Sequence, residues 1–211
     1  MKFTRNTKTH SNYWRNRKIS WEEHYGNWQH PHRQLIVGFL KQIPWMSLVE
    51  VGCGAGANLI AIIKGVPGSH QLGGIDISED AIKELKDKIP NAMVRVGSID
   101  DIMMSDKSAD CILSDMALIY FSPKDVKKCL KEIKRVARNY VILCELNSTS
   151  WWNRMALKYN TGYYAHDYRR LLTQNGFCDI VSYKLQPKDW PESTLQQNFA
   201  SIIIAKILPV I

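Results

Sequence analysis

Residues 48–59 read LVEVGCGAGANL and decide the fold expected for the whole chain. An apolar run containing Glu50 leads into three glycines at alternate positions, Gly52, Gly54 and Gly56. This order predicts a strand, a tight turn and the start of a helix. Glycines suit such a turn because they accept positive φ and let a ligand approach the backbone. The helix N-terminus adds unpaired N–H groups, so the turn predicts a site for an oxygen-rich ligand.

Strands and helices alternate on both sides of this turn along the chain. Seven strands are expected, at 47–51, 71–77, 92–96, 109–114, 140–145, 177–185 and 199–208. Alternation over some 130 residues predicts a mostly parallel sheet with helices on both faces. The last two strands are joined by a polar linker without a helical pattern, so they are expected to be antiparallel. The fold class is therefore α/β.

The N-terminal part differs from the rest in composition. Residues 1–32 are basic and rich in Trp, Tyr and His, and Ser20 followed by acids predicts the start of a short helix. We expect residues 1–32 to form a helical cap or lid, with residues 1–12 frayed. Residues 33–211 are expected to form one domain, in which 146–165 is an insertion on the substrate side.

Composition indicates an ordinary globular protein. The 211 residues are 45% hydrophobic and 23% charged, which excludes disorder along the whole chain. No apolar run approaches the ~20 residues of a membrane span, and no signal peptide is evident. The five cysteines include no C-x-x-C pair, which fits free thiols in a reducing cytoplasm. We expect a soluble, cytoplasmic monomer or homodimer without a metal.

The net charge of +8 comes from two segments. Residues 1–33 carry seven Lys or Arg against two acids, and residues 124–138 carry the same numbers. In 124–138 the apolar residues fall on one helical face, so the cations are expected on a solvated outer face. The alternative is an anionic partner such as nucleic acid, which we do not favour.

The glycine turn has two interpretations. Gly52, Gly54 and Ala57 meet the pattern G-x-G-x-x-G/A, and Asp76 lies at a workable distance for a ribose, as in an NAD-dependent oxidoreductase. Glu50 argues against this interpretation because its carboxylate would repel a pyrophosphate at short range. A cationic ligand suits Glu50 better.

Four motifs in order favour such a ligand: EVGCGAG at 50–56, GIDIS at 74–78, VGSIDD at 96–101 and ADCILSD at 109–115. Together they resemble the motifs of class I S-adenosylmethionine (SAM) methyltransferases, and the resemblance covers about residues 33–208. It implies a Rossmann-like, seven-stranded sheet whose last strand is inserted antiparallel. It also implies SAM as cofactor and S-adenosylhomocysteine (SAH) as product.

The resemblance implies roles for particular residues. The glycine turn and Glu50 would hold the methionine part of SAM, Asp76 both ribose hydroxyls, and Asp115 would lie where donor and acceptor meet. The implied cofactor-binding set is Glu50, Gly52, Gly54, Gly56, Asp76, Ile77, Ser98, Ile99 and Asp115. Ile77 would pack on the adenine, with Ser98 and Ile99 at its polar edge, although family members commonly have Asp where Ser98 stands. The alternative is that Asp76 and Asp115 are ordinary loop acids and Ile77 is core.

Aromatic residues indicate where the acceptor binds. Segments 1–32, 115–122 and 146–165 hold 13 of the 21 aromatic residues. The candidate pocket residues are Trp21, Trp28, Tyr120, Trp151, Trp152, Tyr163 and Tyr164, with Tyr159 beside them. They would form a largely apolar pocket that excludes water or holds a cationic amine. The alternative is that they pack the cap onto the domain.

Methyl transfer is an in-line displacement that needs alignment and the exclusion of water. An O or N acceptor also loses a proton, for which His166, Tyr120 and His24 are the candidate proton acceptors, with His30 and His32 behind them. The favoured function is a small-molecule O- or N-methyltransferase. Alternatives are an RNA or protein methyltransferase that uses the basic arm, a SAM-binding protein without catalysis, and an NAD-dependent oxidoreductase.

Overall fold

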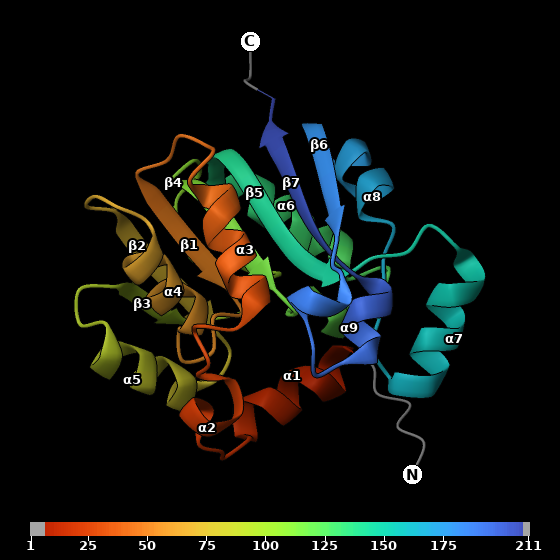
Figure 1. Cartoon of the computed structure of the whole chain (residues 1–211), viewed down its shortest axis with the longest axis horizontal. Coiled ribbons are helices and arrows are strands. Elements are labelled where there is room, and N and C mark those ends of the chain that lie inside the picture. The colour runs from red at the N-terminus through yellow and green to blue at the C-terminus, as the bar shows by residue number, and fades with distance from the viewer. Residues whose placement is uncertain (1–6, 209–211) are drawn as a thin grey trace.

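The computed structural model describes residues 7–208, with side chains from His10 onward. It consists of one twisted sheet with helices on both faces and two short helices across one end (Figure 1). Residues 1–6 and 209–211, which belong to the expected cap and domain, lie outside the described residues.

The sheet has seven strands in the order β3-β2-β1-β4-β5-β7-β6. Their bounds are β1(Ser47–Val51), β2(Gln71–Asp76), β3(Met93–Val96), β4(Ala109–Asp115), β5(Ala137–Leu146), β6(Phe177–Lys184) and β7(Ala200–Ile207). Strands β1 to β5 pair in parallel. β7 lies between β5 and β6 and is antiparallel to both. This arrangement confirms the predicted Rossmann-like sheet with its last strand inserted antiparallel.

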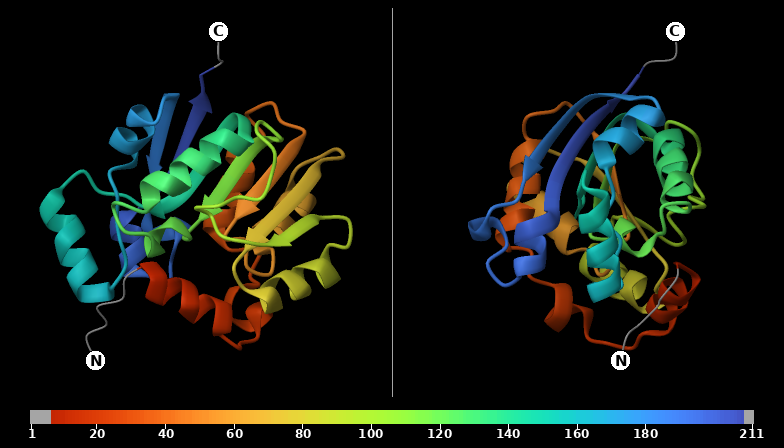
Figure 2. Two further views of the ribbon diagram at one scale, coloured as in Figure 1. Left: turned by 180° about the vertical axis from the view of Figure 1, so that it is seen from behind. Right: turned by 90° about the vertical axis from the view of Figure 1, so that its right-hand side faces the viewer.

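The helices cover the sheet in two layers and close one end of it (Figure 2). Their bounds are α1(Thr7–Asn16), α2(Trp21–Tyr25), α3(Pro31–Leu40), α4(Ala57–Gly65), α5(Glu79–Lys88), η1(Leu118–Tyr120), α6(Val126–Val136), α7(Trp151–Thr161), α8(Tyr168–Gln174), η2(Pro187–Asp189) and α9(Thr194–Phe199). Most buried apolar residues of α3, α4 and α5 belong to one core cluster, and those of α6 and α8 belong to another. The sheet therefore separates two hydrophobic cores.

Alternation along the strands explains this separation. Successive side chains of a strand point to opposite faces. In β4, Ile112 lies in the core under α6, and Cys111 and Leu113 lie in the core under α3 and α4. The α6 pattern behaves as predicted, because the apolar residues of α6 are buried and lysines such as Lys127 and Lys131 are exposed.

Two local expectations are wrong. Residues 7–12 belong to α1 rather than to a frayed end, because His10 on this helix is buried and packs against Tyr120, with ring centroids 5.2 Å apart. The linker before β7 is not irregular, since it contains η2 and α9. A capping box forms η2, in which the Gln186 N–H donates to Asp189 Oδ2 at 2.8 Å.

The parallel strands end at the side of the sheet where α1 and α2 lie (Figures 1 and 2). Ligands of such sheets bind beyond the carboxyl ends of the strands. Within residues 7–208, every helix is too short or too polar to cross a lipid bilayer.

Candidate active site

The turn after β1 needs its glycines. Gly52 and Gly56 have φ values of 74° and 84°, which residues with a Cβ rarely adopt. A Cβ at Gly52 would lie 2.3 Å from the Cβ of Ala117, and one at Gly56 would lie 2.3 Å from Leu85 Cδ1. These contacts let the turn pack tightly against the loop after β4 and against α5, which fixes the floor of the site.

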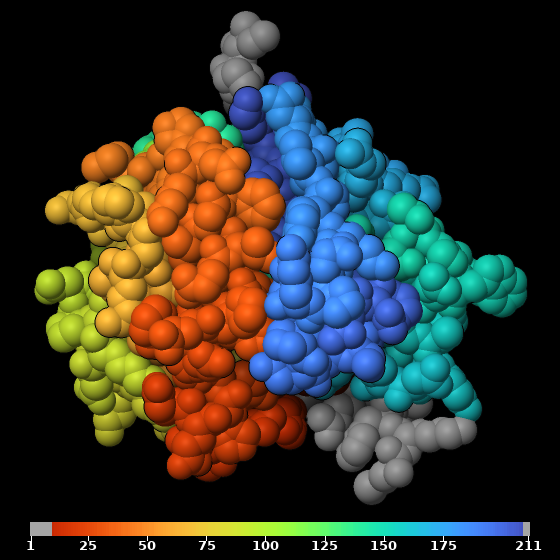
Figure 3. All heavy atoms as spheres, in the orientation of Figure 1, coloured from red at the N-terminus to blue at the C-terminus, as the bar shows by residue number. Residues whose placement is uncertain are grey.

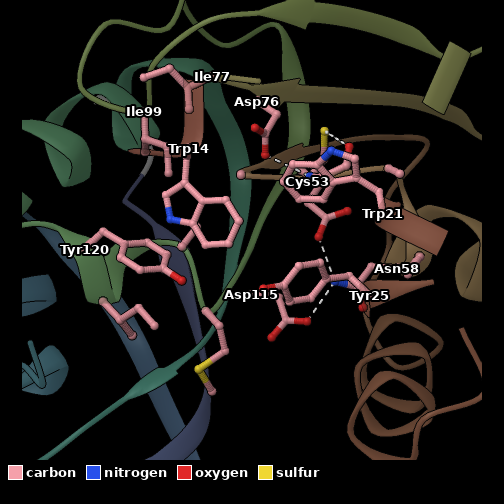
Figure 4. Close-up of a pocket in the computed structure, with 18 of the residues that line it drawn as sticks. Trp14, Trp21, Tyr25, Cys53, Asn58, Asp76, Ile77, Ile99, Asp115 and Tyr120 are labelled. Atoms are coloured by element: carbon pink, nitrogen blue, oxygen red, sulfur yellow. Dashed lines mark hydrogen bonds between the residues drawn. The ribbon is translucent and has the colours of Figure 1, made fainter. Parts of the chain in front are cut away.

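A buried polar cluster lies beside this turn. Asn58, at the start of α4, donates through Nδ2 to Glu50 Oε1 at 2.7 Å and to Asp115 Oδ2 at 2.9 Å (Figure 4). The remaining oxygens, Glu50 Oε2, Asn58 Oδ1 and Asp115 Oδ1, are buried and have no hydrogen-bond partner among the described residues. Buried acceptors without a donor are costly in a folded protein. The cluster is therefore built for a ligand that donates hydrogen bonds.

The two acids of this cluster differ in their proton affinity. Burial raises the pKa of Glu50 to about 8, although the hydrogen bond from Asn58 opposes the rise. Burial also acts to raise the pKa of Asp115, but His32, Arg33 and the hydrogen bond from Asn58 together outweigh it and hold this pKa below its usual value. Asp115 is therefore the permanently ionised member, and Glu50 gains its charge readily only when a cation is close.

Asp76 at the end of β2 joins the turn to α5. Its Oδ2 accepts from the Gly54 N–H and its Oδ1 from the Ser78 N–H, both at 2.9 Å. Burial raises the pKa of Asp76, and these backbone hydrogen bonds oppose the rise. Each oxygen keeps a second lone pair for a ligand hydroxyl.

All of these groups face one cavity of about 320 Å³. Every predicted cofactor-binding residue lines it except Gly56, which instead packs on Leu85. Of the predicted pocket aromatics, Trp21, Tyr120 and Tyr163 line the cavity. Further lining residues that the sequence did not single out are His10, Trp14, Tyr25, Arg33, Asn58, Trp190 and Gln196.

The N-terminal helices cover this cavity. Trp14 of α1 lies between Ile99 and Tyr120 (Figure 4), and its ring centroid is 5.5 Å from that of Tyr120 and 5.7 Å from that of Trp21. The Trp21 ring lies 3.3 Å from the position that a Cβ at Gly54 would take. Ion pairs join the cap to α5, with Lys18 Nζ 2.7 Å from Asp80 Oδ2 and Glu22 bonded to Lys88.

The other predicted aromatics lie elsewhere. Trp28 packs on the α3 and α4 side, where Lys64 Nζ lies 5.0 Å from its ring centroid. Trp151 and Tyr164 line a second cavity of about 350 Å³ that shares no lining residue with the first. Trp152 is 75% exposed. These four positions correct the expectation of a single aromatic pocket. Trp151 and Trp152 lie on α7, which buries only Leu157 and projects from the body of the protein (Figure 1).

The three candidate proton acceptors are also dispersed. Tyr120 lines the first cavity, and burial raises its pKa well above the usual value. His166 lines the second cavity, its Nε2 lies 3.1 Å from the Phe121 carbonyl oxygen, and burial lowers its pKa to about 4. His24 is exposed and its Nδ1 lies 2.9 Å from the Ser20 carbonyl oxygen. The structure thus brings only Tyr120 of these three to the first cavity.

Two residues at the start of α3 complete the site. His32 Nε2 lies 2.9 Å from Asp115 Oδ2, and the side chains of both are almost fully buried. Arg33 lines the cavity, and its buried Nε has no hydrogen-bond partner among the described residues. Sequence reasoning named His32 only as a secondary candidate and missed Arg33. The one sequence feature that could have indicated these two site residues is the clustering of His30, Pro31, His32 and Arg33 at the start of an apolar helix.

Comparisons with known proteins agree on the fold. The chain superposes on a geranyl diphosphate methyltransferase in complex with GPP and sinefungin, with a TM-score of 0.71 and 13% identity over 96% of this chain and 99% of that one. It superposes on magnesium protoporphyrin IX methyltransferase from Synechocystis PCC 6803 with bound SAH, with a TM-score of 0.69 and 15% identity over 96% of this chain and 100% of that one. At these identities the likeness shows the fold alone.

Sequence comparisons add the family. A protein from Streptomyces fradiae, described as an uncharacterized 37.1 kDa protein in transposon TN4556, is 28% identical over 110 residues, which are 51% of this chain. The match spans about a third of that protein's length. Residues 48–139, from β1 to the start of β5, match the family model described as a methyltransferase domain. The chain therefore carries a methyltransferase domain, and its strand order and glycine turn resemble those of the class I SAM-dependent methyltransferases.

Proposed function

We propose that this methyltransferase transfers the methyl group of SAM to an O or N atom of a small-molecule acceptor held beneath the N-terminal cap. One observation carries the proposal. The residues predicted to hold SAM and the aromatic side chains of the cap line the same cavity. Ligand pockets in proteins are typically such concave, mostly apolar spaces with a few polar groups.

The polar groups of the cavity fit the amino-acid end of SAM. Three buried oxygens without donors, on Glu50, Asn58 and Asp115, match the three N–H bonds of an ammonium group. Arg33, with its buried and unpartnered Nε, offers a donor for the carboxylate. Asp76 would accept from the ribose hydroxyls, as the resemblance implies. When bound, SAM supplies an electrophilic methyl carbon on a sulfonium.

The acceptor side is aromatic. Trp14, Tyr25, Tyr120, Tyr163 and Trp190 line it, and Arg33 is the single Lys or Arg among the described lining residues. This lining favours a flat, apolar acceptor that is neutral or cationic. Enclosure by the cap excludes water and aligns the reacting groups. Because its pKa is raised, the Tyr120 hydroxyl stays protonated at neutral pH and would orient the acceptor as a donor rather than remove its proton.

Two of the structural neighbours are described as methyltransferases of geranyl diphosphate and of magnesium protoporphyrin IX, which are small molecules. Their names support the acceptor class proposed for this chain. That no metal is needed, that the protein is a monomer or homodimer and that it is cytoplasmic remain predictions.

The test uses SAM labelled in the methyl group. The full chain is incubated with separated small-molecule, RNA and protein fractions of a cell extract, at low and at moderate salt. We expect label in the small-molecule fraction with little dependence on salt. Label that enters only RNA or protein would refute the proposed acceptor class.

A second candidate acceptor is RNA, favoured by the second cavity. Four cationic side chains line it, Lys127, Arg154, Lys158 and Arg170, beside Trp151 and Tyr164. Cations and aromatic rings together are typical of single-stranded nucleic acid sites. In that case RNA labelling would fall steeply as salt rises.

A further inference from the structure

A chain of hydrogen-bonding side chains leads from the cavity to the protein surface. His32 Nε2 lies 2.9 Å from Asp115 Oδ2 and His30 Nε2 lies 2.8 Å from Glu192 Oε2. Between them, Nδ1 of His32 contacts Nδ1 of His30. Asp115, His32 and His30 are buried, with side chains 5%, 1% and 9% exposed, whereas the Glu192 side chain is 64% exposed. The Asp115 end of this hydrogen-bonded series therefore faces the cavity, and the Glu192 end faces solvent.

The number of protons on the His30 and His32 rings determines the charge of this hydrogen-bonded series. Ionised Asp115 and Glu192 only accept hydrogen bonds, so His32 and His30 must both carry a proton on Nε2. The contact between the two Nδ1 atoms needs one further proton, since two lone pairs would repel. The two rings together then hold three protons, and one ring is an imidazolium. Burial lowers the pKa of His32 despite the charge of Asp115.

Packing holds the His30 and His32 rings in place. His32 stacks on Trp190, with centroids 4.0 Å apart and an interplanar angle of 15°. His30 is the N-cap residue of α3, and Pro31 occupies its first turn. The η2 segment, which Trp190 directly follows, lies beside α3 (Figures 1 and 3). The rings are therefore set by two elements far apart in the sequence.

We propose that the His30–His32 pair shares one extra proton and thereby holds Asp115 as an ionised carboxylate aimed into the cavity, where it receives the ammonium group of SAM. His30 and His32 are positioning residues that act through Asp115. The inference rests on the proposed placement of SAM. Its consequence is that donor affinity depends on histidines that lie outside the cavity lining.

The charges around Asp115 explain why such a pair is needed. Glu50 lies on β1, and Asn58 bridges it to Asp115. Two buried carboxyl groups therefore lie close together. Arg33 of α3 is the other cation that acts on Asp115. His30 faces Glu192, His32 and Trp190. Burial acts to raise the pKa of Asp115, so without the positive charge of the pair a neutral Asp115 would be favoured.

The first experiment measures SAH binding by calorimetry at pH 7. His32→Phe keeps an aromatic ring to stack on Trp190 but loses both hydrogen bonds, and we expect it to weaken SAH binding about tenfold or more. His32→Gln, which can still donate to Asp115, should recover part of this loss. The control His70→Gln changes a histidine that stacks on Trp45, outside the site, and should bind SAH as the wild type does.

Asp115→Asn separates the two proposals. If Asp115→Asn weakens SAH binding but His32→Phe does not, the role of the histidine pair is overturned and the donor site stands. If Asp115→Asn binds SAH normally, the placement of the ammonium fails, and the inference fails with it. Neither result tests the proposed acceptor class, because SAH binding needs no acceptor.

The second experiment needs no variant and no ligand. In the full chain labelled with 15N-histidine, nuclear magnetic resonance of the ring nitrogens should show three protons shared by His30 and His32 at pH 7, with His32 protonated on Nε2. Two neutral rings, or a His32 protonated on Nδ1 alone, would overturn the proposal.

Discussion

The donor side and the acceptor side of the cavity are built in different ways. Donor groups come from the ends of neighbouring parallel strands, Glu50 on β1, Asp76 on β2 and Asp115 on β4, and hydrogen bonds tie them to the turn or to α4. Acceptor-side groups come from helices and loops scattered along the chain, such as Trp14, Tyr163 and Trp190. Backbone geometry fixes the first set, whereas side-chain packing between distant segments fixes the second.

The largest expected effect tests the donor side. Asp76→Ala removes the acceptor for the ribose hydroxyls and also the bonds to the N–H groups of Gly54 and Ser78. We expect SAH affinity to fall about a hundredfold, since hydrogen bonds to a buried carboxylate are strong. Calorimetry measures the loss, and Asp87→Ala on the exposed side of α5 is the matched control. Unchanged affinity would remove Asp76 from the donor site.

The difference between the two sides also explains what the sequence could predict. In β1 and β2, strand pattern, glycine spacing and terminal acids lie within a few residues of one another, so the sheet order and the cavity residues Glu50, Asp76 and Asp115 were predictable. Trp151 and Trp152 follow a strand that ends at the same edge, yet α7 projects outward and carries them away. Local pattern does not encode the direction in which such a helix leaves the sheet.

Arg33 and His32 show a second limit of local pattern. They belong to an amphipathic helix whose apolar face predicts packing only. They reach the site because α3 packs beside α4 with its N-terminus at the carboxyl edge of the sheet. Contacts between distant segments, such as His30 with Glu192, leave no trace in residue spacing.

The next effect concerns Glu145, which lies where the two sides join. Its Oε1 accepts from Ser114 Oγ at 2.7 Å and from the N–H groups of Ala117 and Leu118 at 3.1 and 3.0 Å, just ahead of Tyr120. Burial raises the pKa of Glu145 to about 8 from 4.5. The folded state thus prefers neutral Glu145. The contribution of Glu145 to the free energy of unfolding is therefore full below pH 4.5 and is lost as pH rises toward 8.

We therefore expect Glu145 to make the free energy of unfolding fall by about 2.5 kcal/mol between pH 5 and pH 7. Glu145→Gln removes this titration, while Glu50, whose pKa is also raised, titrates in both proteins. Urea unfolding at several pH values should show the variant losing less stability than the wild type as pH rises. Parallel pH profiles would show that Glu145 is not held neutral in the folded protein.

A smaller effect is expected on the acceptor side. Trp14→Ala removes a ring that packs against Trp21, Tyr25 and Tyr120, each pair being worth about 1 kcal/mol. The cap should open more often, and we expect SAH to dissociate about tenfold faster in stopped-flow measurements. Asn12→Ala, on the exposed side of the same helix, is the control. An unchanged dissociation rate would mean that α1 does not close over the donor.

The smallest expected effect tests whether the exposed aromatic residues of α7 lie outside the acceptor side. Trp152 is 75% exposed and its ring contacts Trp151 edge-on, with centroids 4.6 Å apart. Exposed positions of this kind contribute within about 0.5 kcal/mol to stability, so Trp152→Ala should keep the wild-type melting temperature and SAH affinity. The rate of label transfer to the small-molecule fraction should also be unchanged. A fall in that rate without a change in SAH affinity would assign α7 to the acceptor side and enlarge that side beyond the cavity under the cap.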